Sequence, residues 1–197
     1  MPRRSASLVS ACLLPLLVST GALARDCEAD ARAAMVDVRH PVAILQHVST
    51  IMGENTMRSL ALTTPDNRGM SMSEDGTPMT LWVGGRFYTT ADKGKTWKLM
   101  SESSEEAQAE AMEQLRARAA AATNITCAYD TELEGRKVHH FSLDYVLENV
   151  GMEMQGEYWI DAETGFPWRI KTVSPHNTII QDNEPAPAGM GVPDPEG

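Results

Sequence analysis

The sulfur-containing side chains are the residues whose types and spacing could support chemistry in this sequence. Two cysteines, Cys27 and Cys127, lie downstream of the N-terminal apolar segment. They lack the C-x-x-C spacing of redox and zinc motifs, so a structural disulfide between them is the favoured interpretation, and a free redox or metal-binding thiol pair is the alternative. Such a bridge would close a loop of about 100 residues and contribute up to ~4.7 kcal/mol in the chain-entropy model.

Methionine is frequent, with 12 in 197 residues. Two M-x-M pairs lie in segments with strand periodicity, so both members of each pair point to one face of a sheet. Thioethers are flexible and polarizable, so they could line a cavity for variable apolar ligands, bind Cu(I) as soft ligands, or only fill a core. We expect both pairs to face one apolar interior. The candidate cavity residues are Met57, Met70, Met72, Met79, Met152 and Met154.

Other reactive side chains do not form a recognisable constellation. His139 and His140 are adjacent in a strand-like segment and must face opposite ways, so they cannot easily share a metal ion. No H-x-x-x-H, H-E-x-x-H or G-x-S-x-G motif occurs. We therefore expect no enzymatic activity, no resident metal and no cofactor.

The N-terminus has the pattern of a secretory signal peptide. Arg3 and Arg4 precede an apolar run over 8–18, and Ala22-Leu23-Ala24 offers small residues for cleavage after Ala24. The apolar run is too short to span a bilayer, and no later segment approaches the ~20 residues of a transmembrane helix. The sequence thus predicts a signal peptide over 1–24 and a mature periplasmic protein that does not span the membrane, in a compartment where disulfides persist.

The charge balance is acidic. The chain has 27 Asp and Glu against 17 Lys and Arg, for a formal net charge of −10 at pH 7. Acidic proteins repel nucleic acid and anionic lipid surfaces, and the basic residues form no cluster. We expect no nucleic-acid partner.

Hydrophobic periodicity predicts helices and short strands in alternating blocks. Predicted helices cover 28–38, 41–53 and 103–122. Predicted strands cover 56–64, 68–73, 79–83, 86–90, 95–100, 125–132, 137–147, 152–162, 168–174 and 178–181. The fold class is therefore α+β, a strongly curved antiparallel sheet (a half-barrel) clasping two or three helices. From Asn183 the chain is rich in Pro, Gly and acid, which predicts a disordered tail over 183–197.

Three segments carry a resemblance to a known family. The segment YWIDAETGFPWRI (158–170) has a strand ending in Asp161, a Thr-Gly turn and a strand that starts Pro-x-Arg. Together with WVGGRFY (82–88) and GKTW (94–97), it resembles the periplasmic lipoprotein-carrier (LolA-like) superfamily. The resemblance implies an unclosed β-barrel over 25–182, with helices capping its concave side and a hydrophobic cavity for acyl chains.

The leading hypothesis is an exported protein that binds or carries a hydrophobic ligand, either a lipid or the acyl chain of a lipoprotein. The first alternative is an envelope protein that binds or inhibits another protein through its sheet edges or acidic face. The second alternative is a Cu(I)-binding protein that uses its methionine pairs. The expected partners are accordingly a hydrophobic ligand or lipoprotein, with a possible envelope protein partner.

Overall fold

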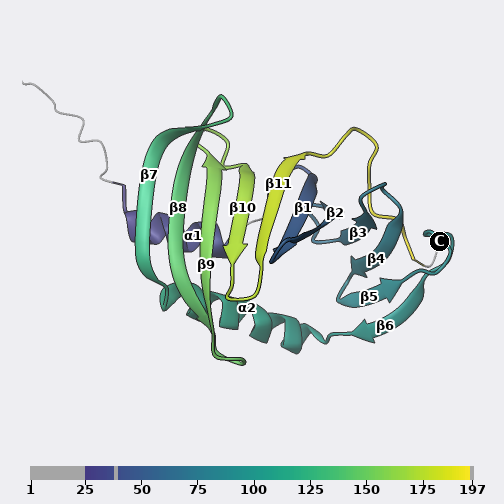
Figure 1. Ribbon diagram of the computed structural model, residues 1–197. Helices are drawn as coiled ribbons and strands as arrows, with labels where there is room; N and C mark the ends of the chain where they lie inside the picture. Colours follow the sequence, from purple (N-terminus) through teal and green to yellow (C-terminus); the bar gives the residue numbers. More distant parts are fainter. Residues whose placement is uncertain (1–24, 38–39, 196–197) are drawn as a thin grey trace, which may run out of the picture.

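One open antiparallel sheet of eleven strands forms most of the fold (Figure 1). The computed structural model describes residues 25–37 and 40–195, so the predicted signal peptide over 1–24 lies outside the described residues. The strand order is β6-β5-β4-β3-β2-β1-β11-β10-β9-β8-β7. Helix α2 (Glu105–Ala120) carries the chain from the β6 edge to the opposite β7 edge, and the pairing of β1 with β11 joins the two halves.

The strands have the following bounds. They are β1 (Ile44–Met52), β2 (Asn55–Thr63), β3 (Gly69–Ser73), β4 (Pro78–Val83), β5 (Arg86–Thr89), β6 (Lys98–Glu102), β7 (Thr123–Leu133), β8 (Arg136–Leu147), β9 (Met152–Asp161), β10 (Pro167–Val173) and β11 (Thr178–Pro185). Ten of them agree in position with the ten predicted strands apart from their end residues, so the periodicity and turn signals were sufficient for these elements.

The predicted helix over 41–53 is wrong, because this segment is strand β1. Apolar residues at three-residue spacing suggested a helix, but the strand lies between two neighbours, β2 and β11, that together use its backbone groups on both sides. Gly53 has φ +59°, which suits the tight turn between β1 and β2. The tertiary pairing outweighs the local pattern.

Both observed helices begin with a side-chain cap. The side chain of Asp26 accepts a hydrogen bond from the backbone N–H of Ala29 at 3.2 Å and caps α1 (Cys27–Val36). The Ser104 side chain accepts from the backbone N–H of Ala107 at 3.2 Å and caps α2. Helix α2 thus begins two residues after the start of the predicted range. The helices predicted over 28–38 and 103–122 are otherwise confirmed.

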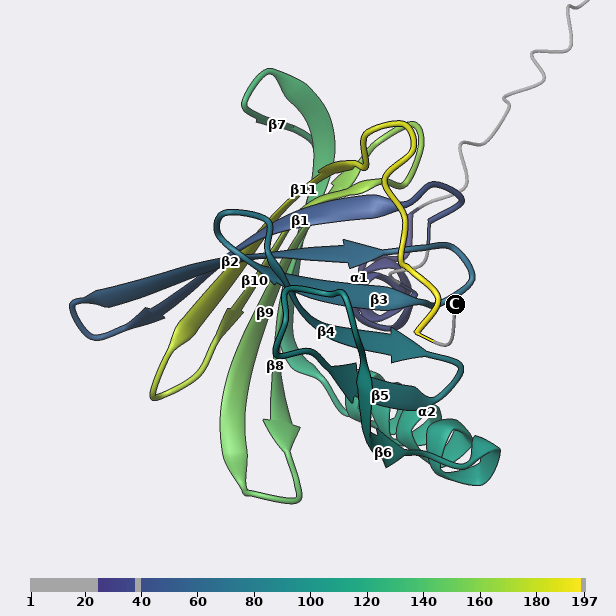
Figure 2. The ribbon, with the colours of Figure 1, turned by 90° about the vertical axis from the view of Figure 1, so that its right-hand side faces the viewer.

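The sheet is not strongly curled, so the predicted half-barrel is wrong (Figure 2). Figure 2 shows β1–β5 running at a steep angle to β8 and β9, as accumulated strand twist produces. Helix α1 packs against β7, β8 and β9, and α2 packs against α1 and β8. Both helices cover the β7–β9 side of the sheet. The strands β1–β6 therefore have no helix against which they could curve.

Two hydrophobic clusters stabilise the protein, and they lie on opposite faces of the sheet. The first cluster, on the face that α1 and α2 cover (the helix face), contains Ala31, Met35, Ala119, Ala122, Phe141, Leu143 and Tyr158. The second cluster contains Leu45, Leu62, Met72, Leu81, Tyr88 and Val192.

The strand register fixes this change of face. Leu45 of the second cluster is directly opposite Glu184, so the two side chains share a face. Asp182, two residues before Glu184, points the same way and is opposite Arg169, which in turn is opposite Trp159. Tyr158 of the first cluster precedes Trp159 and therefore points to the other face. We call the face of the second cluster the outer face.

The C-terminal segment covers the second cluster, which differs from the predicted disordered tail. Strand β11 continues through Asn183, whose buried side chain donates from Nδ2 to the carbonyl of Pro167 at 2.5 Å. Beyond it, the residues 186–195 (the C-terminal strap) cross the outer face. Val192 is buried in the second cluster, and an Arg68 guanidinium nitrogen donates to the carbonyl of Pro193 at 2.9 Å. The apolar patch on β1–β5 needs a cover, and the strap supplies it.

The strap generates the first prediction. Val192→Asp places a carboxylate in the second cluster, so we expect urea unfolding to show a loss of roughly 2 kcal/mol or more in the free energy of unfolding. The matched control is Met190→Asp, because Met190 is 37% exposed in the same strap. Equal stability of the two variants would show that the strap does not stabilise the fold.

The disulfide generates the second prediction. Cys27 and Cys127 are bonded in the structure, with 5.8 Å between their Cα atoms, and the bond joins the start of α1 to β7. Replacing both residues by alanine should lower the free energy of unfolding by about 2–5 kcal/mol, because the bond closes a loop across a separation of 100 residues. Thiol labelling of the denatured wild type without reductant should find no free cysteine, and two free thiols would contradict the bond.

Candidate functional site

Two pockets flank the first cluster at opposite ends. The α2 pocket has a volume of about 670 Å³ and lies where the C-terminal end of α2 meets the ends of β8, β9 and β10. Its lining residues include Arg118, Ala121, Asn124, Asp144, Tyr145, Met154, Val173 and Pro175. The α1 pocket has a volume of about 520 Å³ and lies between α1 and the other ends of β8–β10. Both volumes are in the range of about 300–1,000 Å³ that is usual for ligand sites.

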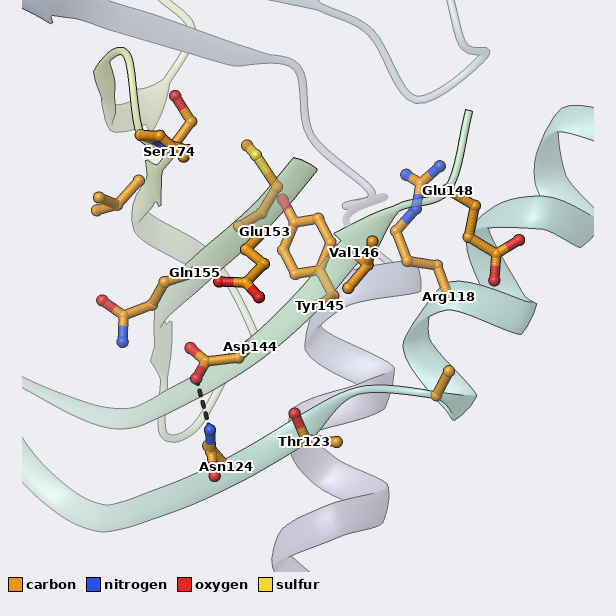
Figure 3. A pocket seen from close by; sticks show the side chains of 14 residues that line it. Arg118, Thr123, Asn124, Asp144, Tyr145, Val146, Glu148, Glu153, Gln155 and Ser174 are labelled. Carbon is orange, nitrogen blue, oxygen red and sulfur yellow. Dashed lines mark hydrogen bonds between the residues drawn. The ribbon is translucent and has the colours of Figure 1, made fainter. Parts of the chain in front are cut away.

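The α2 pocket combines an apolar wall with a polar rim. Tyr145 and Met154 are directly opposite each other on β8 and β9, and both are half-buried on the helix face. Burial raises the pKa of Tyr145, and the nearby Arg118 cation offsets only part of this rise. At the rim, the Asn124 amide donates to the Asp144 carboxylate at 2.8 Å (Figure 3). The arrangement suits an apolar ligand that keeps one polar end near solvent.

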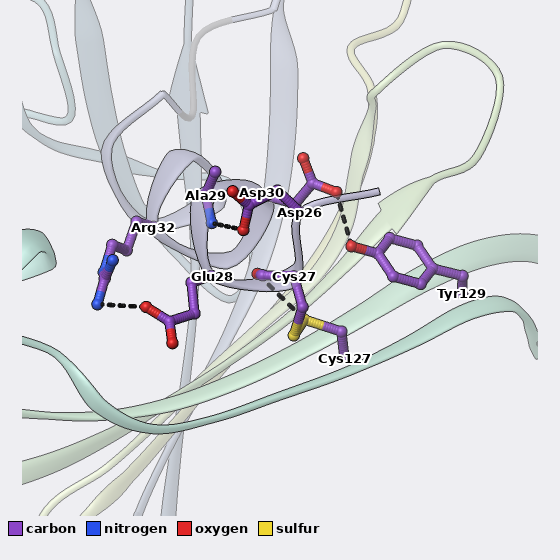
Figure 4. The surroundings of a disulfide bond; sticks show 8 residues. All are labelled: Asp26, Cys27, Glu28, Ala29, Asp30, Arg32, Cys127 and Tyr129. Carbon is purple, nitrogen blue, oxygen red and sulfur yellow. Dashed lines mark hydrogen bonds and ion pairs between the residues drawn. A yellow bond between two sulfur atoms is a disulfide. The ribbon is translucent and has the colours of Figure 1, made fainter. Parts of the chain in front are cut away.

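The α1 pocket has small residues on its helix side. Ala33 and Ala34 of α1 line it together with apolar side chains of the sheet, including Phe141 and Ile160. Beside the pocket, the Tyr129 hydroxyl donates to the Asp30 carboxylate at 2.6 Å, close to the disulfide (Figure 4). Burial, together with this hydrogen bond, raises the pKa of Tyr129 to about 12. The phenol therefore stays neutral at physiological pH and serves to hold α1 against β7.

Asp161 organises the turn between β9 and β10 at the edge of the α1 pocket. Its Oδ1 accepts hydrogen bonds from the backbone N–H and hydroxyl of Thr164, both at 2.8 Å, and its Oδ2 accepts from Trp168 Nε1 at 3.0 Å. Burial opposes ionisation, but these hydrogen bonds outweigh it and lower the pKa of Asp161 to about 2. This is the Asp and Thr-Gly hairpin that carried the family resemblance.

Comparison with known proteins places this arrangement among solved folds. No family model matches the chain, and no curated protein matches it by sequence. The lipoprotein LppX of Mycobacterium tuberculosis matches with a TM-score of 0.51 and 13% identity, over 82% of this chain and 95% of LppX. The two proteins share a fold.

Two further structures have looser similarity. One is the MucA/MucB complex of Pseudomonas aeruginosa, with a TM-score of 0.46 and 11% identity over 82% of this chain and 59% of that chain. The other is the LolA superfamily protein NE2245 of Nitrosomonas europaea, with a TM-score of 0.34 and 9% identity over 81% of this chain and 92% of that chain. The predicted resemblance is confirmed at the level of the fold alone, by the match to LppX.

The sheet separates the predicted methionine pairs. Met70 and Met72 pack in or against the second cluster, on the outer face. Met154 lines the α2 pocket on the helix face, with Met152 half-buried two residues earlier. Four strands lie between β3 and β9. The five steps from strand to strand, at 4.8 Å each, place β3 and β9 about 24 Å apart along the sheet. The two pairs therefore do not face one interior.

Met57 and Met79 do not join either pair. Met57 is 55% exposed in β2, and Met79 is 39% exposed in β4. Strand periodicity could establish that each pair shares a face, but it could not establish which face is covered. Of the six candidate residues, only Met154 lines a pocket described here.

The histidines face opposite ways, as predicted. The His139 ring contacts Tyr129 at 5.2 Å between centroids beside the α1 pocket, whereas His140 stacks on Trp159 at 4.4 Å on the outer face. Within residues 25–37 and 40–195, no group of three or more His, Cys, Asp and Glu side chains is placed to hold a metal ion. No helix in the same residues has the length and apolarity to cross a membrane.

Sequence reasoning missed the alanines and Arg118, which line the pockets but have no motif. Ala33 carries no signal beyond its place in a helix. Arg118 lies in the last turn of α2, where a cation is expected in any case from the helix dipole. Asp161 could have been found, because the hairpin motif that contains it was recognised.

The Asp161 turn generates a prediction of pH dependence. The pKa of Asp161 is lower in the folded protein, at about 2, than the ordinary aspartate value of 3.8. The contribution of this carboxylate to stability is therefore full above pH 4 and is lost as the pH falls toward 2. Asp161→Asn should therefore lower the free energy of unfolding by about 1 kcal/mol at pH 7 and have little effect near pH 2. Chemical denaturation at both pH values measures this.

Glu163→Gln is the control for Asp161→Asn. Glu163 is an exposed residue of the same turn, and its carboxylate accepts no hydrogen bond from the described residues. Glu163→Gln should therefore change the free energy of unfolding little at either pH. A loss in Asp161→Asn that is the same at pH 2 as at pH 7 would show that the charge of Asp161 does not stabilise the turn.

Proposed function

We propose that this protein binds a hydrophobic ligand, a lipid or the acyl chain of a lipoprotein, in the α2 pocket, and carries it outside the cytoplasm. The observation that carries the proposal is this pocket of about 670 Å³, where the C-terminal end of α2 meets the ends of β8, β9 and β10, with Tyr145 and Met154 on its wall. Side chains do not fill the space at this end of the first cluster.

The incomplete cover on the helix face supports this proposal. Helix α1 has only 10 residues, and only Ala119 of α2 is fully buried. Each methylene group of a ligand buried on this face gains about 0.8 kcal/mol, so a chain of ten methylenes gains roughly 8 kcal/mol before the costs of association. The pocket can therefore bind an acyl chain without a specific polar contact.

The extracytoplasmic location rests on two features. The Cys27–Cys127 bond joins α1 to β7, and such bonds persist in oxidising compartments rather than in the cytoplasm. The predicted signal peptide over 1–24, cleaved after Ala24, would direct the chain to the periplasm. The LolA-like fold is compatible with a carrier in that compartment.

A partner protein is the second candidate, and the β6 edge favours it. All five residues of β6 are exposed, among them Leu99 and Met100, and an open strand edge can pair with another chain. Cu(I) binding by both methionine pairs gains no support, because the pairs lie on opposite faces. Mass spectrometry of the protein purified from its own envelope distinguishes these functions, since it detects a bound lipid, a stoichiometric protein partner or copper.

The pocket wall generates the next prediction. Met154→Glu should weaken binding of a fluorescent fatty acid more than about tenfold, because a carboxylate on the pocket wall resists burial with an acyl chain. Met154→Leu should bind as the wild type does, since volume and polarity are nearly conserved. Met57→Glu is the matched control, because Met57 lies on an exposed strand position outside both pockets. Fluorescence titration measures binding, and circular dichroism checks folding.

A second pair of variants tells the two pockets apart. Ala33→Trp fills the α1 pocket, and Ala29→Trp places the same ring on an exposed position one turn earlier in α1. The proposal expects both variants to bind the probe normally. Loss of binding in Ala33→Trp alone would move the ligand to the α1 pocket, and a folded wild type that binds no probe would reject the carrier function.

A further inference from the structure

Arg118 differs from the other arginines of the described residues in having no partner for its charge. Most of the others form an ion pair with a carboxylate, and Arg68 donates to a backbone carbonyl. Arg118 makes neither an ion pair nor a hydrogen bond with any described residue, although acidic side chains outnumber basic ones in the chain. A half-buried cation in an acidic protein normally finds a carboxylate.

The position of Arg118 relates this cation to the proposed ligand. Its side chain extends from the last turn of α2 toward the end of β8, at the α2 pocket (Figure 3). It is half-buried, and its positive charge is near enough to the Tyr145 phenol to lower the pKa of that group. The cation is the only basic side chain among the residues that line this pocket.

The acidic residues at the pocket do not neutralise Arg118. Asp144 accepts the hydrogen bond from Asn124. Glu148 and Glu153 are exposed, so solvent and salt screen their charges, and neither lies within 4.0 Å of the guanidinium. By strand alternation, Asp144 and Glu153 also point to the outer face, whereas Met154 and Tyr145 point to the helix face beside Arg118.

We infer that the ligand is an anionic amphiphile, with its acyl chain along Met154 and Tyr145 and its acidic group bound by the Arg118 guanidinium. This inference rests on the proposed function and specifies its ligand class. The planar guanidinium binds carboxylate and phosphate oxygens in a bidentate manner, so both a fatty acid and a phospholipid have the required chemistry.

The test compares probes of equal chain length that differ only at the head group. A dansyl-labelled fatty acid, its methyl ester, the corresponding primary amine and the corresponding monophosphate are titrated into the wild type, Arg118→Gln and Arg116→Gln. Arg116 is the matched control, because it lies two residues earlier on α2, pairs with Glu113 and does not line the pocket. Circular dichroism melts establish that all three proteins are folded.

We expect the wild type to bind the fatty acid about tenfold more tightly than the ester, and the ester at least as tightly as the amine. Arg118→Gln should lose about tenfold for the acid and leave the ester unchanged, while Arg116→Gln should leave both unchanged. Tighter binding of the monophosphate than of the fatty acid would identify a phosphate as the head group of the ligand. Tighter binding of the fatty acid would identify a free carboxylate. Both results support the inference.

Three results would overturn the inference. In the first, Arg118→Gln binds the acid as tightly as the wild type does, and the ester still binds. The pocket then holds an acyl chain, but Arg118 does not bind the head group. If the amine binds best, the rim carboxylates select a cationic ligand. If no probe binds to the folded wild type, the proposed function fails together with the inference.

Discussion

The need to shield apolar side chains on two faces of one open sheet determines the rest of this structure. The first cluster lies on the helix face at β7–β10, and the second lies on the outer face at β1–β5. Each requires its own cover, and the described residues have two helices over the first cluster and none over the second. The helices therefore gather over the first cluster, and the C-terminal strap covers the second. The pockets follow from this division, because α1 and α2 are too small to fill the helix face between them.

The ligand site depends on the same division. A longer or bulkier α1 would have closed the helix face, but its surface toward the sheet is made mostly of alanine with Met35. The disulfide and the Tyr129–Asp30 hydrogen bond hold this short helix in place, since a helix of ten residues is marginal on its own. Fixing α1 at its N-terminal end leaves space at both ends of the first cluster.

Sequence reasoning could predict the local elements and the disulfide better than the faces. Turn chemistry and two-residue periodicity located ten strands. The two cysteines downstream of the predicted signal peptide identified the bond between Cys27 and Cys127. The segment 41–53 was predicted as a helix, because Leu45, Val48 and Ile51 have helical spacing. Only its pairing with β2 and β11 makes this segment a strand. The separate faces of Met70 and Met154 depend on register across six strands, which no local pattern contains. Arg118 could not be singled out, because its lack of a partner is visible only when all neighbours are placed.

The pairing of β1 with β11 has a consequence for how the protein is made. This pairing places Ile51 opposite Thr178, so the centre of the sheet joins segments from near the two ends of the chain. A chain that emerges from its N-terminus presents β1 well before β11 is available. Until then one edge of β1 has unpaired backbone groups and can associate with other strands. The central pair of strands is therefore completed last, after every other strand of the sheet has emerged.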